Sequence, residues 1–158
     1  MLDARMRNAP ALSQGNEITG REPSLGGILR QRYIIHVNDE QSIVGLMSLI
    51  FTRYGFRETG FDTPMTAYHY ALEHTPDLFI IDDMMPDICG EELIELILNT
   101  EILKNIPIIF MTARARFRWN TNLEAANIPV VIMPFILEGQ FMPLVRRLLG
   151  MPRYESVT

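Results

Sequence analysis

The chain has 158 residues, of which 47% are apolar and 21% charged, which is the size and balance of one globular domain. No apolar run approaches the roughly 20 residues of a membrane span, and the N-terminus lacks the apolar core of a secretory signal. The net charge is −5 and Cys89 is the single cysteine, which argues against nucleic-acid binding and excludes an internal disulfide framework. We therefore expect a cytoplasmic protein.

Residues 1–31 are predicted to form a flexible N-terminal tail, because they are rich in Gly, Pro, Ser and Asn and show no periodicity. This segment holds four Arg against three acids, so the acidic excess lies in the remainder of the chain. We expect one domain over residues 32–150 and a short C-terminal tail over residues 151–158. The N-terminal tail is either a solvated extension or an arm that binds a partner.

Apolar strands and amphipathic helices alternate through the predicted domain. A β-rich run at 33–37 is followed by a helix between Ser42, a candidate N-cap, and Gly55, a candidate helix stop. In chain order, the remaining elements expected are a strand at 56–60, a helix at 64–74, a strand at 77–82, a helix at 90–99, a strand at 106–112, a helix at 115–126, a strand at 129–133 and a helix at 137–149. This is five strand–helix units.

Near-continuous apolar strands that alternate with helices predict an α/β fold with a parallel sheet covered by helices on both faces. Among doubly wound sheets we expect the flavodoxin-like strand order 2-1-3-4-5. Ligands of such sheets bind at the carboxyl ends of the strands where the order switches, here between the first and third strands.

Polar residues follow the strands at this edge. Asn38, Asp39 and Glu40 follow the first strand, Asp82 and Asp83 end the third, and Thr112 ends the fourth. Carboxylates gathered at one edge repel each other unless a cation joins them, and Mg²⁺ prefers oxygen ligands with waters and a phosphate. A carboxylate can also act as a nucleophile that forms an aspartyl phosphate. The arrangement suggests phosphoryl transfer onto an aspartate.

The sequence resembles the receiver domain of bacterial two-component response regulators over roughly residues 32–150. The resemblance is carried by IIHVNDE at 34–40, PDLFIIDDMMPDICG at 76–90, PIIFMTA at 107–113 and MPF at 133–135. It implies a response regulator that accepts a phosphoryl group from a histidine kinase or a phosphotransfer protein and signals through protein–protein contacts, without being an enzyme.

Carried over by position, the resemblance assigns roles to individual residues. It implies Asp82 as the phosphoacceptor, Asp39 as an acidic Mg²⁺ ligand, and Met84 as the donor of a backbone carbonyl to the metal. Thr112 corresponds to the switch hydroxyl of the family. Pro134 corresponds to a proline that follows a cis peptide bond, and Gly90 to the turn into the third helix.

The sequence departs from the family at three positions. Asn38 stands where the first strand usually supplies a second acid, so it would hold the metal only weakly, through water. Met133 replaces a lysine that pairs with the phosphoryl group, which removes a contact of about 1.5–3 kcal/mol. Val130 replaces the aromatic residue that swings inward on activation.

Of two other basic residues, only one is placed to substitute for the missing lysine. Lys104 precedes the fourth strand and so belongs at the opposite edge of the sheet. Arg114, two residues beyond Thr112, is placed on the active edge, and we expect it as a candidate surrogate cation.

Several nearby polar residues have simpler interpretations. Strand alternation directs Asp83 away from Asp82, so we expect a solvated or structural role. Glu40 either contacts metal-bound water or opens the first helix. His36 is expected to be a core histidine, and Cys89 to be inert.

The run ARARFRW at 113–119 is basic and aromatic, and is interpreted as a solvated helix face or a protein-docking surface. Receivers commonly dock partners through the fourth and fifth helices, so Arg118, Trp119, Arg146 and Arg147 are candidate contacts, including for a homodimer.

Two alternatives remain. A haloacid dehalogenase-type phosphatase would need a second acid two residues after the nucleophile, where Met84 stands. A pseudo-receiver, which keeps the fold as a phosphorylation-independent interaction module, is favoured by Asn38 and Met133. The short segment after Gly150 suggests a stand-alone receiver whose output goes through a partner protein.

Overall fold

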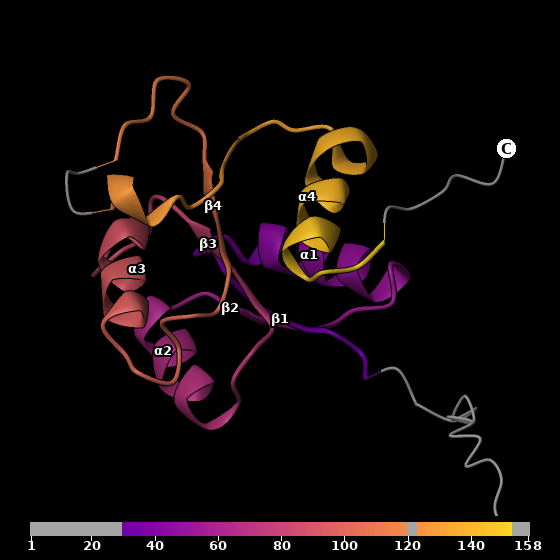
Figure 1. The fold of residues 1–158 in the computed structure, drawn as a ribbon. Helices are drawn as coiled ribbons and strands as arrows, with labels where there is room; N and C mark the ends of the chain where they lie inside the picture. Colours follow the sequence, from indigo (N-terminus) through magenta and orange to yellow (C-terminus); the bar gives the residue numbers. More distant parts are fainter. Residues whose placement is uncertain (1–29, 120–122, 153–158) are drawn as a thin grey trace, which may run out of the picture.

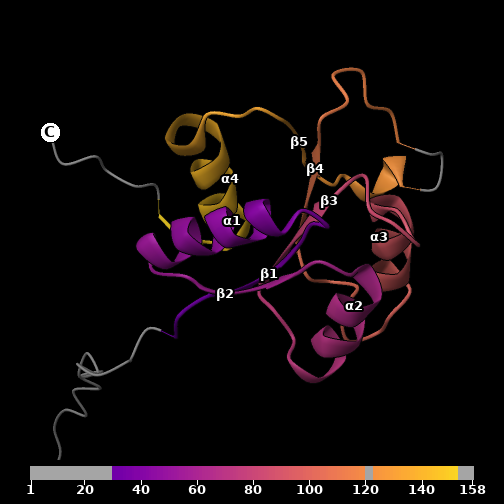
Figure 2. The ribbon, with the colours of Figure 1, turned by 180° about the vertical axis from the view of Figure 1, so that it is seen from behind.

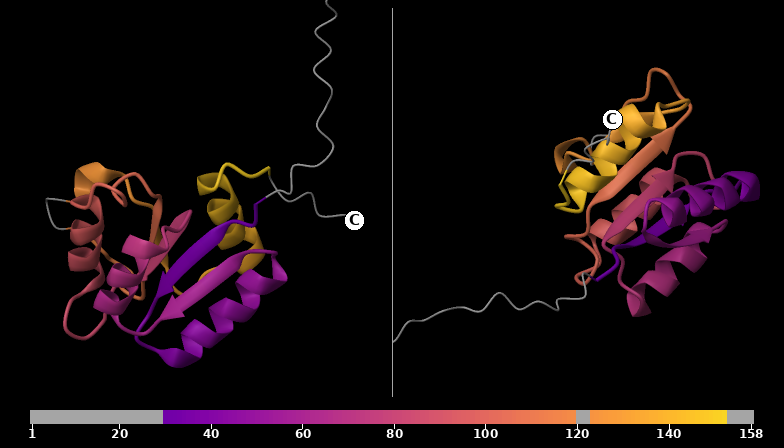
Figure 3. Two further views of the ribbon diagram at one scale, coloured as in Figure 1. Left: turned by 90° about the horizontal axis from the view of Figure 1, so that it is seen from below. Right: turned by 90° about the vertical axis from the view of Figure 1, so that its right-hand side faces the viewer.

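A computed structural model describes residues 30–119 and 123–152. Its sheet has five parallel strands in the order β2-β1-β3-β4-β5, which confirms the expected order. The strands are β1 (Tyr33–Val37), β2 (Arg57–Phe61), β3 (Leu78–Asp82), β4 (Ile108–Thr112) and β5 (Val130–Ile132). Their parallel course is visible in the two views of Figure 3.

Helices cover both faces of the sheet, as expected (Figures 1 and 2). One face carries α2 (Pro64–Glu73) and α3 (Gly90–Leu98), and the other carries α1 (Gln41–Arg53) and α4 (Met142–Leu148). A π-helical turn, η2 (Leu137–Phe141), runs directly into α4, and a 3-10 turn, η1 (Glu124–Ala126), precedes β5. The two layers of helices enclose two separate apolar clusters.

The strands form because their side chains are buried on both sides. All five residues of β1, β3 and β4 are buried, as expected for the central strands of a covered parallel sheet. Alternate residues pack against opposite helical layers, so Ile35 and Phe79 contact the α2/α3 cluster while Ile34 and Ile80 contact the α1/α4 cluster. The same alternation fixes the directions of the polar residues at the strand ends.

The helix expected at 115–126 was wrong for the residues that the structure describes in that range. Residues 113–119 form an irregular loop, and only the short turn η1 follows. Phe117 and Trp119 of this loop pack on Phe110 of β4, with ring centroids 4.9 and 4.7 Å away. These aromatic contacts partly bury the two side chains without a helix, and we call residues 113–119 the β4 loop below.

Smaller differences concern helix ends. The first helix begins at Gln41 with Glu40 as its N-cap, two residues before the predicted cap at Ser42. Gly55 ends it as predicted, because its φ of 81° lies in the left-handed region that favours glycine. The last predicted helix is divided into η2 and α4. No helix in the described part of the chain is long and apolar enough to cross a membrane.

The predicted tails lie mostly outside the described residues. The last two residues of the predicted N-terminal tail are described and contact the domain. Arg30 forms an ion pair of 3.1 Å with Asp77, and the Gln31 side chain donates a hydrogen bond of 3.0 Å to the Gly55 carbonyl.

Candidate functional site

The site lies at the carboxyl edge of the sheet, where β1 and β3 are neighbours. Asp82 ends β3 and is paired in register with Met111 of β4. It is 8% exposed, and by strand alternation it shares its face with Ile80 and the α1/α4 layer. The fold therefore places the predicted phosphoacceptor at the switch point of the strand order.

The carboxyl group of Asp82 holds its proton more tightly than an ordinary aspartate. Burial is the main cause that raises its pKa to about 6, and the negative charges of Asp39 and Asp83 add to the effect. The backbone N–H of Met84 opposes it by donating a hydrogen bond of 3.2 Å to Asp82 Oδ2. No ion pair to Asp82 is formed within the described residues, so its charge is left uncompensated by protein cations.

Asn38 and Glu40 have local roles in the turn that follows β1. Asn38 is 2% exposed, and its Oδ1 accepts a hydrogen bond of 2.8 Å from the backbone N–H of Glu40. Glu40 is exposed and forms the N-cap of α1, and its side chain accepts a hydrogen bond of 2.6 Å from the Ser42 hydroxyl. One of the two lone pairs of Asn38 Oδ1 is therefore used by the backbone, and the other can accept a hydrogen bond from a metal-bound water.

The donor set at this edge fits a magnesium ion with few protein ligands. No three His, Cys, Asp or Glu side chains gather at a possible metal site anywhere in the described residues. The raised pKa of Asp82, caused in part by Asp39, nevertheless marks a concentration of negative charge that a cation would relieve. Mg²⁺ keeps several waters and often takes one or two carboxylates, so the chemistry of Asp39, Asp82 and the Met84 carbonyl is compatible with this metal.

Gly90 brings α3 close to the end of β3. Its backbone N–H donates a hydrogen bond of 2.9 Å to the Asp83 carbonyl. A Cβ at this position would collide with the backbone carbonyl of Asp82 and lie 2.8 Å from the Phe110 ring. Only glycine therefore allows the first turn of α3 to approach this closely.

Asp83 belongs to a network on the α2/α3 side of the sheet. It is 2% exposed, so the expectation of a solvated carboxylate was wrong, whereas a structural role agrees with its contacts. Its Oδ2 accepts hydrogen bonds from the Thr112 hydroxyl at 2.6 Å and from Arg114 Nε at 2.5 Å. Its Oδ1 accepts one from a terminal nitrogen of Arg114 at 2.6 Å, which makes the Arg114 contact bidentate.

Arg114 links this network to α3 and to the β4 loop. The same terminal nitrogen lies 3.6 Å from Glu91 Oε1 in the first turn of α3, and the guanidinium carbon lies 4.8 Å from the centre of the Phe117 ring. The Asp83 carboxylate is the main cause of a raised Arg114 pKa. As a surrogate cation Arg114 is thus on the correct edge, but its guanidinium contacts Asp83 and Glu91 in this structure.

The side chain of Met133, which follows the last strand, has no charge and no hydrogen-bond donor to replace the lysine usual in the family. Met133 packs against the α1/α4 cluster, and its backbone N–H donates a hydrogen bond of 2.8 Å to the Thr112 carbonyl. The peptide bond between Met133 and Pro134 is cis, in agreement with the resemblance. Val130, half-buried in β5, packs against the α2/α3 cluster.

Three residues expected to have no part in the chemistry have structural surroundings of their own. His36 is fully buried within β1, as expected for a core histidine, and burial lowers its pKa to about 4. Lys104 forms an ion pair of 2.8 Å with Glu101, ahead of β4 at the opposite edge. Cys89 is the N-cap of α3, and its backbone N–H donates a hydrogen bond of 2.8 Å to Glu92.

Residues 34–132, more than half of the chain, match the family model of the response regulator receiver domain. The chain belongs to the response regulator receiver family. As a receiver it is a signalling module of two-component systems and not an enzyme. The match covers the strands and strand ends that build the site described above.

Relatives and solved structures agree with this assignment. The hybrid signal transduction histidine kinase D of Dictyostelium discoideum is 32% identical over 82 residues, which are 52% of this chain and 5% of the kinase. The polar-differentiation response regulator DivK of Brucella ovis is 24% identical over 117 residues, 74% of this chain and 95% of DivK. The response regulator TrrA of Thermotoga maritima, solved in complex with Mg²⁺ and BeF, is 25% identical with a TM-score of 0.67, covering 75% of this chain and 99% of TrrA.

The receiver spans half or less of the length of the first curated relatives that it matches. The activities of those whole proteins therefore do not follow from the match. DivK is different, because the match covers nearly all of that regulator.

The candidate docking residues do not form one helical surface on this receiver. Trp119, beside the exposed Arg118, packs against the α2/α3 cluster, whereas Arg146 and Arg147 belong to α4 on the other side of the sheet. The helix expected at 115–126 is not formed in the described residues of that range, so the predicted surface lacks one of its two helices there. The homodimer through this surface stays a prediction.

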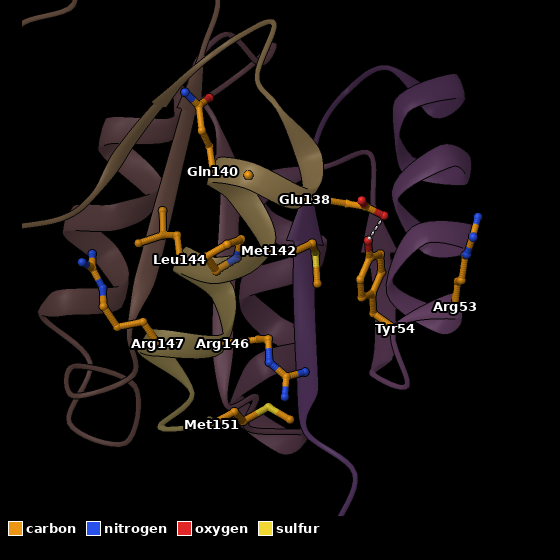
Figure 4. A pocket seen from close by; sticks show the side chains of 11 residues that line it. Arg53, Tyr54, Glu138, Gln140, Met142, Leu144, Arg146, Arg147 and Met151 are labelled. Carbon is orange, nitrogen blue, oxygen red and sulfur yellow. Dashed lines mark hydrogen bonds between the residues drawn. The ribbon is translucent and has the colours of Figure 1, made fainter. Parts of the chain in front are cut away.

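A groove of roughly 1240 Å³ lies between the end of α1 and the η2–α4 segment (Figure 4). Arg53, Arg146 and Arg147 line it, and the Tyr54 hydroxyl donates a hydrogen bond of 3.0 Å to Glu138 across it. None of the acids at the carboxyl edge lines this groove, so it is separate from the candidate phosphorylation site.

The contact between Asp83 and Arg114 was missed by the sequence analysis. The available signal was the parallel register of β3 and β4, in which Asp83 follows the Asp82–Met111 pair and so lies opposite Thr112. That register places the acid and the hydroxyl on the same face, and Arg114 two residues later within reach of both.

Proposed function

We propose that this receiver accepts a phosphoryl group on Asp82 and signals through protein–protein contacts. The observation that carries the proposal is the position of Asp82 at the switch point, with a carboxyl group that has no cationic partner among the described residues. A pKa of about 6 leaves roughly nine-tenths of the group ionised at pH 7, so it can act as a nucleophile.

The reaction transfers a phosphoryl group from a phosphohistidine of a sensor histidine kinase or a phosphotransfer protein. An oxygen of Asp82 forms the new O–P bond, and the P–N bond of the donor breaks with its electron pair going to the imidazole. The product is an aspartyl phosphate on Asp82. Membership of the two-component family supports a histidine kinase as the partner.

Magnesium is the cofactor that we propose for this site, held by Asp39, Asp82 and the backbone carbonyl of Met84, with Asn38 contributing only through water. When bound, it would supply positive charge that offsets the negative charge of the phosphoryl oxygens. TrrA, a structural neighbour, was solved with Mg²⁺ and BeF, which supports the choice of metal.

Protein donors around the phosphoryl group are fewer than in the usual receiver. Met133 offers no charge, so the Thr112 hydroxyl and the Arg114 guanidinium are the donors that we propose to contact the phosphoryl group. The loss of one charge-assisted hydrogen bond costs about one to two decades in an equilibrium constant. The aspartyl phosphate is therefore expected to form, but to be less stable than with a lysine at this position.

Output is proposed to go through a downstream protein partner, as for a stand-alone receiver in the cytoplasm. The nearly full-length match to DivK supports this arrangement. The net charge of −5 argues against nucleic acid as the partner.

The proposal is tested by the intact mass of the protein after incubation with acetyl phosphate and Mg²⁺. We expect one phosphoryl adduct on the wild type and none on Asp82→Asn, with less adduct on Asp39→Asn or when Mg²⁺ is removed by chelation. Glu101→Gln, which removes an exposed acid far from the site, is the control for loss of charge. No adduct on the wild type, together with no Mg²⁺ binding by titration, would contradict the proposal.

A pseudo-receiver is the second candidate, and one observation favours it. The Thr112 hydroxyl and Arg114 are both bound to Asp83, so the donors for a phosphoryl group already have an acidic partner. In that case the fold would act as an interaction module that is not phosphorylated.

A further inference from the structure

The carboxylate of Asp83 binds the two groups at the end of β4 that we propose as donors to the phosphoryl group, the Thr112 hydroxyl and the Arg114 guanidinium. It is buried, it takes the hydrogen of the Thr112 hydroxyl at 2.6 Å, and it binds two nitrogens of Arg114 at 2.5 and 2.6 Å. The backbone N–H of Arg114 in turn donates a hydrogen bond of 3.0 Å to Thr112 Oγ1. The three residues form a closed network on the side of the sheet opposite the direction of Asp82.

Thr112 cannot donate a hydrogen bond to Asp83 and to a phosphoryl group at the same time. A hydroxyl has a single hydrogen to donate, and Asp83 accepts it. The backbone N–H of Arg114 already donates to the hydroxyl oxygen, which further fixes the orientation of the side chain. Thr112 can therefore donate to a phosphoryl oxygen on Asp82 only after it leaves Asp83.

Arg114 connects Asp83 to the aromatic residues of the β4 loop. The guanidinium lies over the Phe117 ring at 4.8 Å, and Phe117 packs edge-on against Trp119 with centroids 4.8 Å apart. Both rings cover Phe110 of β4. The aromatic contacts and the Arg114–Asp83 contact together hold the β4 loop on the sheet, although residues 113–119 form no helix.

We propose that Asp83 is a positioning residue that holds Thr112 and Arg114 away from Asp82, so that phosphorylation must displace it and thereby release the β4 loop. The proposal rests on the proposed function of Asp82 as phosphoacceptor. It assigns to Asp83 a regulatory role in this chain, in which an internal carboxylate competes with the phosphoryl group for the same two donors.

The experiment combines Asp83→Asn with two measurements on the full chain. Asparagine has nearly the shape of aspartate but no charge, so it weakens the hold on Arg114 with little change in packing. The first measurement, hydrogen–deuterium exchange of residues 113–119 without any phosphodonor, tests the anchoring of the loop alone. The second is the fraction of protein with a phosphoryl adduct at steady state with acetyl phosphate and Mg²⁺, where Glu101→Gln is the control of equal charge change.

Without a phosphodonor, we expect exchange in residues 113–119 to be faster in Asp83→Asn than in the wild type, and unchanged in Glu101→Gln. With acetyl phosphate, we expect the ratio of phosphorylated to free protein to rise about tenfold in Asp83→Asn, since one charge-assisted contact becomes available. The increase should be smaller when Asp83→Asn/Thr112→Val is compared with Thr112→Val alone, because the share of the gain that the hydroxyl contributes is then lost while Arg114 remains. A purely structural role of Asp83 would not depend on Thr112 in this way.

The outcomes separate the two proposals. Equal exchange of residues 113–119 in the wild type and Asp83→Asn would overturn the anchoring by Asp83. An adduct that forms to the same extent in both proteins would overturn the competition while leaving the proposed function intact. No adduct on any of the proteins would overturn the proposed function, and the competition with it.

Discussion

The two faces of the sheet differ in how they hold buried ionisable groups. On the α1/α4 face, neither ring nitrogen of His36 has a hydrogen-bond partner among the described residues, and Nδ1 lies 3.9 Å from Glu58 Oε1. Asp82, on the same face, has a raised pKa. On the α2/α3 face, Asp83 accepts three hydrogen bonds, two of them from Arg114.

This difference indicates where the fold can take up a ligand or a proton. A buried charge with its partners in place is fixed, whereas a buried group without a partner changes its protonation or binds a cation. Two successive aspartates, Asp82 and Asp83, thus have different chemistry because strand alternation sends them to different faces. Substitutions on each face test this difference.

Gly90 packs against the backbone of both Asp82 and Asp83, whose side chains point to opposite faces of the sheet. Its replacement should therefore have the largest effect on stability. In Gly90→Ala the new Cβ would collide with the Asp82 carbonyl, which cannot move without bending β3. We expect the free energy of unfolding to fall by about 3 kcal/mol, measured by urea unfolding. Gly45→Ala is the matched control, since a Cβ at Gly45 would have nothing within 4 Å and alanine favours a helix. Equal stability of both variants would contradict the close approach.

His36 should make stability depend on pH through the α1/α4 face. Burial lowers its pKa in the folded state to about 4, from 6.5 when exposed, so between these values the unfolded chain binds more protons. Stability is therefore lost as pH falls from about 6.5 to about 4, by on the order of 3 kcal/mol at most. Glu58 opposes part of this change, because burial raises its pKa.

The measurement is urea unfolding at pH 7, 5.5 and 4.5 for three proteins. His36→Leu should show a smaller loss of stability than the wild type over this range, because the group that gains a proton on unfolding is gone. Glu58→Gln should show a larger loss, because the opposing group is gone. A wild type and His36→Leu with the same pH dependence would show that His36 is not held neutral.

The contact between Asp83 and Arg114 should stabilise the fold, and removal of Asp83 should cost more stability than removal of Arg114. Asp83→Ala leaves the fully buried Thr112 hydroxyl without its acceptor, and we expect a loss of about 2 kcal/mol. Arg114→Ala should cost about 1 kcal/mol, because half of its side chain is exposed and water screens the pair. A double-mutant cycle by chemical unfolding should give a coupling of roughly 1 kcal/mol, and strict additivity would refute the contact.

The strand order and the residues at the strand ends could be predicted from the sequence, because β1, β3 and β4 lie in apolar runs that are followed by polar residues or end in them. The helix at 115–126 could not be ruled out from the sequence, since no Pro or Gly interrupts these residues. What decides against a helix over the described part is tertiary, namely the packing of Phe117 and Trp119 on Phe110.

The environment of Asp83 shows the same limit for the candidate site. Strand alternation correctly predicted that Asp83 and Asp82 point to opposite faces of the sheet. It could not predict whether the Asp83 carboxylate, which lies just beyond the end of β3, would contact water or another side chain. The outcome depends on Arg114, which reaches Asp83 only because the β4 loop folds back onto the sheet. A contact made by a loop without regular structure has no periodic signal in the sequence.

Asn38→Asp tests whether the α1/α4 face is short of one acid for its metal. Aspartate can still accept the hydrogen bond from the Glu40 backbone N–H, so the turn after β1 should persist while a second carboxylate joins Asp39 near Asp82. We expect Mg²⁺ affinity to rise about tenfold, measured by calorimetric titration at roughly 0.1 M salt. Asn99→Asp adds the same charge at the end of α3, exposed and at the opposite edge of the sheet, and should leave the affinity unchanged. A similar rise in both variants would mean that Mg²⁺ responds to total charge rather than to the carboxylates at the end of β1 and β3.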